Sequence, residues 1–344
     1  MKKINVVQVG TSHPHASGIF KCIKELPEVF EIAGVCEPNE QHRKNLRTEL
    51  YKDTQELSID DILNSSNIDG VIVETEEKNS TRYAQIMADA GFNIHMDKPG
   101  GTDFYEYEKL VKTAKNKGLV FHTGYMYRFN PAVKKSIELV KSGKLGDIYS
   151  VDAQMCIRLS EEVIKDLIKF NGGMMEFLGC HMLDVVLSVL GVPDKVLPMC
   201  YSTHTYDTNA LDYGMTVLKY KNAAAVVRSS AADVNGFIRR QFVINGTLGS
   251  IEIKPMEIFD VENTDYLTTD MNVTYNSNNI NPCFDGSKKL KFNPYKRYDD
   301  MMIDFAEIIC GMHTNEYSYE HEINLKRLIC QAGQTGKYYE RIFE

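Results

Sequence analysis

The sequence predicts an α/β protein in which a doubly wound parallel sheet is followed by an α+β domain with a large, mostly antiparallel open sheet. Two observations carry this prediction. Over residues 1–124, short apolar segments alternate with segments of helical spacing. From residue 147 onward, longer β-rich segments follow one another with few helices between them.

The N-terminal 124 residues are expected to form a Rossmann domain. Their apolar segments are short and continuous, which is typical of strands buried on both faces of a parallel sheet. We expect these strands at residues 4–9, 31–36, 70–73, 92–96 and 119–123. Helices are expected between them at residues 16–26, 39–50, 59–63, 80–90 and 103–117. Right-handed connections between such elements give a doubly wound fold, with ligands bound beyond the carboxyl ends of the strands.

Residues 125–344 are expected to form the second domain, which would bind substrate and make oligomer contacts. A helix is predicted at 130–142, a long apolar helix near 174–190, and two final helices at 296–311 and 319–338. Strands are predicted at 147–157, 195–203, 211–220, 223–230, 238–244 and 248–254. The segment 263–294 is rich in Asn, Thr and Ser and is predicted to be a long loop.

Composition excludes several classes of partner. The chain of 344 residues has a net charge of −8 and no long basic run, which argues against a nucleic acid or an anionic membrane. It shows neither a signal peptide nor a stretch long enough to span a membrane. Its eight cysteines are scattered without a C-x-x-C pair, as expected for reduced thiols in the cytoplasm.

The first predicted strand runs into the turn G-T-S-H-P-H. In a dinucleotide-binding loop, Gly10, Thr11, Ser12 and His13 would approach a pyrophosphate at the beginning of a helix. Ser12 stands where the fingerprint has its second glycine, so the loop alone leaves open a turn that binds nothing. The two histidines of the turn have no evident partner cluster, and no metal site is expected.

The ends of three other strands carry polar residues. Glu37 follows the second strand, where a carboxylate accepts ribose hydroxyls and repels a 2′-phosphate, which favours NAD over NADP. Thr75 ends a third strand, and Asp97 and Lys98 end a fourth. A lysine at this place, fixed by the following proline, is a candidate for proton exchange, although a surface lysine in a turn is the simpler alternative.

In the second domain, G-G-M-M-E-F-L-G-C-H-M-L-D places His181 and Asp184 three residues apart on one helix. Residues at this spacing share a helix face. His181 is a candidate proton carrier, the alternative being a histidine satisfied in the core. Tyr125 and Arg128, in G-Y-M-Y-R-F-N-P, are candidates for binding substrate hydroxyls or for a structural role.

Taken together, this order of motifs resembles the Gfo/Idh/MocA family, the relatives of glucose–fructose oxidoreductase and inositol dehydrogenase. The resemblance rests on D-K-P and G-x-H-x-x-D and covers nearly the whole chain. It implies NAD(P), sugar or polyol substrates, and a homodimer or homotetramer assembled through the C-terminal sheet. It also implies that Lys98 and His181 are the catalytic residues, with Asp184 matching the acidic residue one helical turn later.

The sequence departs from the family pattern in three motifs. The fingerprint glycines are replaced, Glu76 stands where a proline usually follows the third strand, and Phe177 stands where the family has a substrate-binding aspartate. Glu176 is adjacent but is expected about 100° around the helix. Substrate class, and even catalytic competence, therefore stay open.

The sequence thus predicts an NAD(P)-dependent dehydrogenase that acts on a secondary alcohol of a sugar, cyclitol or polyol. Lys98 and His181 would share the acid–base role. Two alternatives remain: an enzyme that recycles NAD while it cleaves a glycosidic bond, and a non-catalytic dinucleotide-binding regulator. Retention of both Lys98 and His181 argues against the regulator, whereas Phe177 argues for it.

Overall fold

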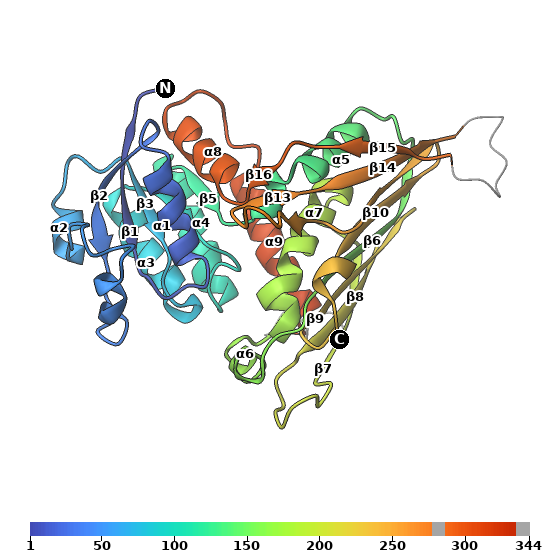
Figure 1. The fold of residues 1–344 in the computed structure, drawn as a ribbon, viewed down its shortest axis with the longest axis horizontal. Helices are drawn as coiled ribbons and strands as arrows, with labels where there is room; N and C mark the ends of the chain where they lie inside the picture. The colour runs from blue at the N-terminus through green and yellow to red at the C-terminus, as the bar shows by residue number, and fades with distance from the viewer. Residues whose placement is uncertain (277–285, 335–344) are drawn as a thin grey trace. The chain divides into compact units, whose positions relative to one another are not determined.

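A computed structural model describes residues 1–276 and 286–334, which form two compact units (Figure 1). The first unit contains Met1–Tyr125 and Tyr298–Lys326, and the second contains, of the described residues, Met126–Arg297 and 327–334. The sequence analysis assigned the whole of 298–326 to the second domain. The structure packs that segment on the first sheet, because Phe305 and Ile309 lie against Gly70.

The first unit is built on a five-stranded parallel sheet of order β2-β1-β3-β4-β5. Its strands are β1 (Ile4–Val9), β2 (Phe30–Cys36), β3 (Gly70–Val73), β4 (Asn93–Met96) and β5 (Phe121–Thr123). β2 lies on one side of β1, and β3, β4 and β5 follow one another on its other side. The strand order therefore reverses between β1 and β3, which makes this place the topological switch point. The predicted doubly wound sheet is confirmed.

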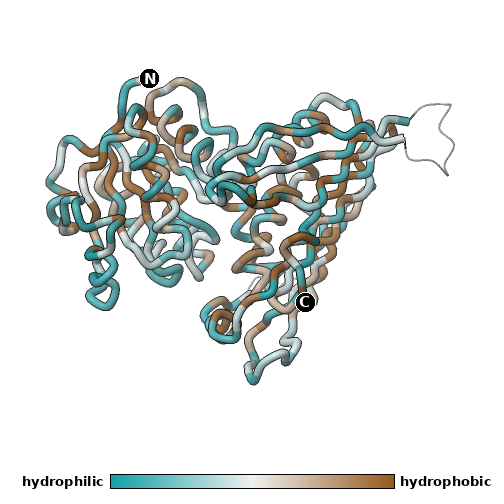
Figure 2. Tube along the Cα trace, viewed as in Figure 1, coloured by the Kyte–Doolittle hydropathy of each residue, from teal (hydrophilic) through white to brown (hydrophobic). Residues whose placement is uncertain are grey.

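Helices flank this sheet. Contacts join α3 (Glu77–Ala90) to α4 (Phe104–Lys117), and α1 (Ala16–Glu25) to α8 (Asp299–Ile309) (Figure 1). Strands β1 and β3 are almost completely buried, and apolar residues, brown in Figure 2, lie on both the strands and the helices of this unit. The short helix α2 (Ile59–Leu63), predicted at these residues, begins with a capping box of Ser58 and Asp61.

The helix predicted at residues 39–50 is wrong. The structure has turns there and a short 3-10 helix, Arg43–Arg47, none of whose residues is buried. Because the segment has no apolar face to bury, tertiary packing does not stabilise a longer helix. The following segment contributes only an isolated parallel bridge, from Glu56 to Val35 of β2.

The second unit is built on an eight-stranded sheet of order β15-β14-β11-β10-β6-β9-β8-β7 (Figure 1). All neighbours are antiparallel except β6 and β9. The strands are β6 (Ile148–Cys156), β7 (Lys195–Tyr201), β8 (Tyr213–Lys219), β9 (Ala224–Ser230), β10 (Gln241–Gly246), β11 (Gly249–Ile253), β14 (Asp270–Tyr275) and β15 (Lys288–Lys291). The predicted large, mostly antiparallel sheet is confirmed.

The long loop predicted at residues 263–294 is wrong for the part that the structure describes. It contains β13 (Tyr266–Thr268), β14 and β15, and β13 forms a small sheet with β12 (Ile258–Phe259) and β16 (Tyr295–Lys296). Met271 and Val273 of β14 are buried between polar neighbours. This alternation is a strand pattern, although the composition is that of a loop.

The helices of the second unit begin with α5 (Pro131–Lys141), which Asn130 caps through two backbone amides. The short helix α6 (Glu161–Asp166) follows β6. The helix predicted at 174–190 is divided: Met175–Gly179 forms a π-helical turn, and α7 (Cys180–Leu190) continues it. Of the last predicted helix, the structure shows α9 (Tyr319–Ala332), and residues 335–338 lie outside the described part.

Candidate functional site

The turn after β1 approaches the end of β3 so closely that residue 10 must be glycine. Gly10 has φ +95°, a region that favours glycine. A Cβ atom at this position would lie 2.5 Å from the backbone nitrogen of Thr75. The single fingerprint glycine therefore serves the packing of the loop against β3.

The amides of this turn already have acceptors within the protein. Thr11 donates its amide to the Glu37 carboxylate, and the amides of Ser12 and His13 donate to the carbonyl oxygen of Glu74. Backbone N–H groups at positions 11–13 are therefore not free to cradle a phosphate. By contrast, the amides of Ser17 and Gly18 at the beginning of α1 have no backbone acceptor among the described residues.

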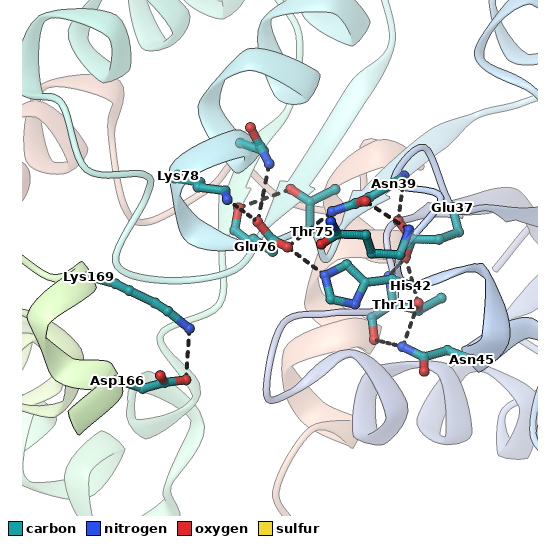
Figure 3. A network of polar contacts seen from close by, with 12 residues as sticks. Thr11, Glu37, Asn39, His42, Asn45, Thr75, Glu76, Lys78, Asp166 and Lys169 are labelled. Atoms are coloured by element: carbon teal, nitrogen blue, oxygen red, sulfur yellow. Dashed lines mark hydrogen bonds and ion pairs between the residues drawn. The ribbon is translucent and has the colours of Figure 1, made fainter. Parts of the chain in front are cut away.

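Glu37, at the end of β2, fastens the turn after β1 (Figure 3). Its Oε2 accepts hydrogen bonds from the Thr11 amide at 2.7 Å and the Thr11 hydroxyl at 2.6 Å. Its Oε1 accepts the Asn39 amide at 2.9 Å. A carboxylate has about four acceptor positions, so one remains for a ribose hydroxyl.

Glu76 links the segments that follow β2 and β3 (Figure 3). Its Oε1 lies 2.5 Å from His42 Nε2 and accepts the Asn39 side-chain amide at 3.1 Å. Lys78 lies 3.0 Å from Oε2. Burial raises the pKa of Glu76, but hydrogen bonds from His42 and Lys78 outweigh it, and the pKa lies below its ordinary value. Thr75, beside it, is buried at the end of β3.

Lys98 is buried in a turn that is fixed on both sides. Its amide donates to Asp97 Oδ1 at 2.6 Å, and its carbonyl oxygen lies 3.2 Å from His13 Nε2. The ammonium group of Lys326 donates to the carbonyl oxygens of Pro99 and Gly101 beyond it. These contacts hold Lys98 in a tight turn at D-K-P-G-G.

His13 and His15 lie against two carboxylates at the carboxyl edge of the sheet. His15 Nδ1 is 3.0 Å from Asp97 Oδ2, and His13 Nδ1 is 3.5 Å from the same oxygen. His13 Nδ1 is also 3.4 Å from Glu74 Oε2. The sequence analysis found no partner cluster for the two histidines, because their partners come from the ends of β3 and β4.

Burial and charge set the protonation of this cluster. Burial lowers the pKa of His13 to about 3, against the opposing effect of Asp97. Burial also raises the pKa of Glu74 well above its ordinary value, and the charge of Asp97 adds to this. For Asp97 the effect of burial is outweighed by His13 and His15, which hold its pKa far below the usual range.

His181, the candidate proton carrier of the second unit, is fully buried on α7. Its ring lies edge-on to Tyr127, with 5.1 Å between the ring centroids. The Tyr127 hydroxyl donates to Glu257 at 2.6 Å and accepts from Arg240 at 3.0 Å. Burial, followed by the charge of Glu257, raises the pKa of Tyr127. The sequence analysis missed Tyr127 and Glu257, which lie 130 positions apart.

Arg128 and Asp184, two of the predicted substrate residues, form an ion pair with each other. Arg128 donates from Nε to Oδ2 of Asp184 at 2.9 Å and from a terminal nitrogen to Oδ1 at 2.7 Å. Both side chains are almost completely buried. This geometry is a two-point ion pair of the strong kind. Tyr125, the third such residue, is buried in the first unit.

Phe177 replaces the family aspartate with an apolar contact. Its ring lies 5.2 Å from that of Phe170, in an apolar cluster with Ile164 and Leu167. The neighbouring Glu176 is buried and accepts the amide of Gly172 at 3.0 Å. In the structure, this hydrogen bond from the Gly172 amide to Glu176 stabilises the chain just before the π-helical turn.

Two sequence profiles match the chain. Residues 4–125 match an oxidoreductase family with an NAD-binding Rossmann fold, GFO/IDH/MocA, and residues 133–252 match the C-terminal domain of the same family. The chain belongs to the Gfo/Idh/MocA family. The resemblance found in the sequence is thereby confirmed. So is the predicted enzyme class, an oxidoreductase, at the level of the family.

Curated members of the family are distant in sequence. An uncharacterized oxidoreductase of Escherichia coli, YhhX, is 27% identical over 192 residues, 56% of this chain and 54% of its own. The D-xylose 1-dehydrogenase (NADP(+)) 2 of Haloferax volcanii is 26% identical over 241 residues, 68% of this chain and 70% of its own. The chain thus spans about half the length of YhhX and somewhat more of the xylose dehydrogenase.

Solved structures of oxidoreductases share the fold over almost the whole chain. A putative NADPH-dependent oxidoreductase from Desulfitobacterium hafniense superposes with a TM-score of 0.80 at 16% identity, covering 97% of this chain and 95% of its own. Aldose–aldose oxidoreductase from Caulobacter crescentus, complexed with glycerol, gives 0.77 at 19% identity, with 97% and 98% covered. In the part of the chain that is described, no helix combines the length and apolarity needed to cross a membrane.

Proposed function

We propose that the protein is an NAD-dependent dehydrogenase that transfers hydride between the nicotinamide and a secondary alcohol of a sugar, cyclitol or polyol. The observation that carries the proposal is the buried Lys98, whose turn is fixed by Asp97 and His13 at the carboxyl edge of the parallel sheet. Ligands of doubly wound sheets bind at this edge. A lysine ammonium group at this edge can donate a proton to, or as the amine accept one from, a bound substrate.

The residues at the switch point fit a dinucleotide. Thr11, Ser12, His13 and Thr75 border the place where β1 and β3 end, and Asp97 and Lys98 border the end of β4. The first amides of α1 and the dipole of that helix attract a pyrophosphate. Glu37 keeps one acceptor position and a negative charge, which supports NAD over NADP. When bound, the nicotinamide supplies the hydride chemistry.

Lys98 and His181 are the proposed acid–base residues. A secondary alcohol must lose its hydroxyl proton as hydride leaves, and a positioned amine or imidazole takes that proton. Positioned groups of this kind contribute roughly 10²–10⁴ in rate. The contact with Tyr127 fixes the ring plane of His181. We assign Arg128 and Asp184 the role of positioning α7 rather than binding substrate, because their charges neutralise each other.

The proposal is tested with the full chain and a panel that includes D-xylose, myo-inositol and glycerol. Xylose and inositol are included because two relatives have the names D-xylose 1-dehydrogenase (NADP(+)) 2 and myo-inositol 2-dehydrogenase. Each alcohol is incubated with NAD⁺ or NADP⁺, and absorbance of the reduced cofactor is followed. We expect net accumulation of NADH with at least one alcohol and a lower kcat/KM with NADP⁺. Higher kcat/KM with NADP⁺ would contradict the assignment of Glu37.

A second candidate is an enzyme that recycles the cofactor, because one relative is named 2,7-anhydro-N-acetylneuraminate hydratase, from Mediterraneibacter gnavus. Such an enzyme consumes its substrate without net NADH, which separates it from a dehydrogenase. A third candidate is a dinucleotide-binding regulator. The apolar packing of Phe177 favours it, and it predicts NAD binding without turnover of any substrate.

Two further parts of the proposal concern assembly and location. The open eight-stranded sheet exposes Tyr149, Met199 and Tyr201, which supports a homodimer or homotetramer assembled through it. Light scattering on the purified chain measures this directly. The absence of paired cysteines among the described residues supports a cytoplasmic location.

A further inference from the structure

We propose that the side chains at the carboxyl ends of β1, β3 and β4 form a closed zinc site within the first unit. Three ligand atoms, His13 Nδ1, His15 Nδ1 and an Asp97 carboxylate oxygen, form a group within 4.8 Å of one another. Glu74 Oε2, which lies 3.4 Å from His13 Nδ1, is the proposed fourth ligand. The site goes beyond the proposed function and does not depend on it.

The distances between ligand atoms suit a tetrahedral ion. Zinc bonds of about 2.0–2.1 Å to nitrogen and oxygen require ligand atoms about 3.3 Å apart at the corners of a tetrahedron. The structure has 3.0 Å between His15 and Asp97, 3.5 Å between His13 and Asp97, and 3.4 Å between His13 and Glu74. The ligand atoms of the two histidines and Asp97 all lie within 4.8 Å of one another.

The orientation of His13 suits a ligand. Its Nε2 lies 3.2 Å from the carbonyl oxygen of Lys98 and 3.8 Å from the Glu77 carboxylate, so the proton belongs on Nε2. The lone pair is then on Nδ1, which lies 3.4 Å from Glu74 Oε2 and 3.5 Å from Asp97 Oδ2. A backbone carbonyl or carboxylate at the far nitrogen is the usual support of a metal-binding histidine. The ion would replace the hydrogen bond that Nδ1 accepts from the His15 amide at 3.2 Å.

Asp97 is divided between two tasks. Its Oδ1 accepts the Lys98 amide at 2.6 Å and lies 3.1 Å from His15 Nδ1, whereas its Oδ2 lies close to both histidines, 3.0 Å from His15 Nδ1 and 3.5 Å from His13 Nδ1. Gly124 makes room for the carboxylate, because a Cβ atom at that position would lie 2.7 Å from Oδ1. The carboxylate is thus held with Oδ2 close to both histidines.

Glu74 supplies an independent indication of a ligand. Its side chain is completely buried, and neither carboxylate oxygen has a hydrogen bond among the described residues. A buried carboxylate is stable only when it is paired, protonated or bound to a cation. Two neutral imidazoles and two carboxylates match the charge of Zn²⁺. Because Glu74 completes four protein ligands, the site is closed, as structural zinc sites are.

The test measures metal in the full chain after treatment with a chelator, reconstitution with Zn²⁺ and dialysis. We expect one zinc per chain, because closed sites hold their metal through dialysis. Glu74→Gln and His15→Ala are expected to weaken binding at least about tenfold. The matched control is His313→Ala, which removes a half-exposed histidine outside the cluster and should bind zinc like the wild type.

Cobalt distinguishes the proposed ligands from others and does not depend on the folding of a variant. Co²⁺ bound to the wild-type chain should show the strong visible bands of a tetrahedral site, without the charge-transfer band of a thiolate. Weak octahedral bands, a thiolate band, loss of the zinc on dialysis, or equal binding by folded Glu74→Gln would each overturn the proposal.

Discussion

The carboxylate of Glu37 accepts two hydrogen bonds from Thr11, at 2.7 Å from its amide nitrogen and 2.6 Å from its hydroxyl. The end of β2 is thereby tied to the turn after β1. The same carboxylate that is expected to select the cofactor also holds the loop on which the cofactor would lie.

Glu37→Gln should weaken both the fold and the selection of NAD. Hydrogen bonds to a buried charged group contribute roughly 1.5–3 kcal/mol, so we expect the free energy of unfolding to fall by about that amount. The ratio of NAD to NADP affinity should also fall, because the negative charge is lost. Urea titration and calorimetric binding measure the two effects. Thr11→Val, which keeps the carboxylate, should lower stability and leave the affinity ratio unchanged.

Gly10→Ala should destabilise the protein far more than Gly91→Ala does. The two glycines have nearly equal φ angles, +95° and +94°, but a Cβ atom meets the Thr75 backbone only at Gly10. The strained backbone costs about 1–2 kcal/mol at either position. The overlap adds about 1–3 kcal/mol at Gly10. Urea unfolding of both variants checks this, and equal losses would contradict the close approach of β1 and β3.

Asp184→Ala should be strongly destabilising. Removal of one partner leaves the guanidinium of Arg128 buried without its counter-charge, which costs about 3–5 kcal/mol. The exposed pair of Lys169 and Asp166 serves as the control (Figure 3). Asp166→Ala should change the free energy of unfolding by less than about 1 kcal/mol. Similar values for the two variants would contradict the burial of the Arg128 pair.

Glu76 should contribute stability that depends on pH. Its folded pKa lies below the ordinary 4.5, because the hydrogen bonds from His42 and Lys78 outweigh burial. Its contribution is therefore complete above the unfolded pKa and is lost as pH falls through the folded pKa. The difference in unfolding free energy between wild type and Glu76→Gln should be constant from pH 7 to about pH 5.5 and shrink below that. If the difference in unfolding free energy between wild type and Glu76→Gln increased as pH falls, the lowered pKa of Glu76 would be contradicted.

The sequence predicted elements whose cause is local. Continuous apolar segments predicted β1 and β3, and the predicted helix at 59–63 is α2, which a capping box at Ser58 stabilises locally. The predictions at 39–50 and, for the described residues, at 263–294 were wrong. Residues 39–50 have no apolar face that could pack against the protein and stabilise a helix. In 263–294 the polar composition indicated a loop, although β14 has alternating buried and less buried residues. The spacing of apolar residues did not predict the π-helical turn at Met175–Gly179, because it predicted one continuous helix there.

The site was predictable where residues follow single strands and not where distant side chains meet. Glu37 and Lys98 were found from their places at strand ends. The contact of His13 with Glu74 and Asp97 depends on the order of strands in the sheet. The ion pair of Arg128 and Asp184 spans 56 positions, so two candidate substrate residues proved to be partners of each other.

The central claim, proton exchange by Lys98 in a dehydrogenase, is tested by steady-state kinetics with the best alcohol of the panel. For Lys98→Ala we expect kcat to fall about 10²–10⁴-fold, with NAD⁺ affinity changed less than about threefold, since a change under 0.7 kcal/mol is expected for a group outside the pyrophosphate contacts. Lys112→Ala, an exposed lysine of α4, is the control and should retain wild-type kcat. Full turnover by folded Lys98→Ala would contradict the account.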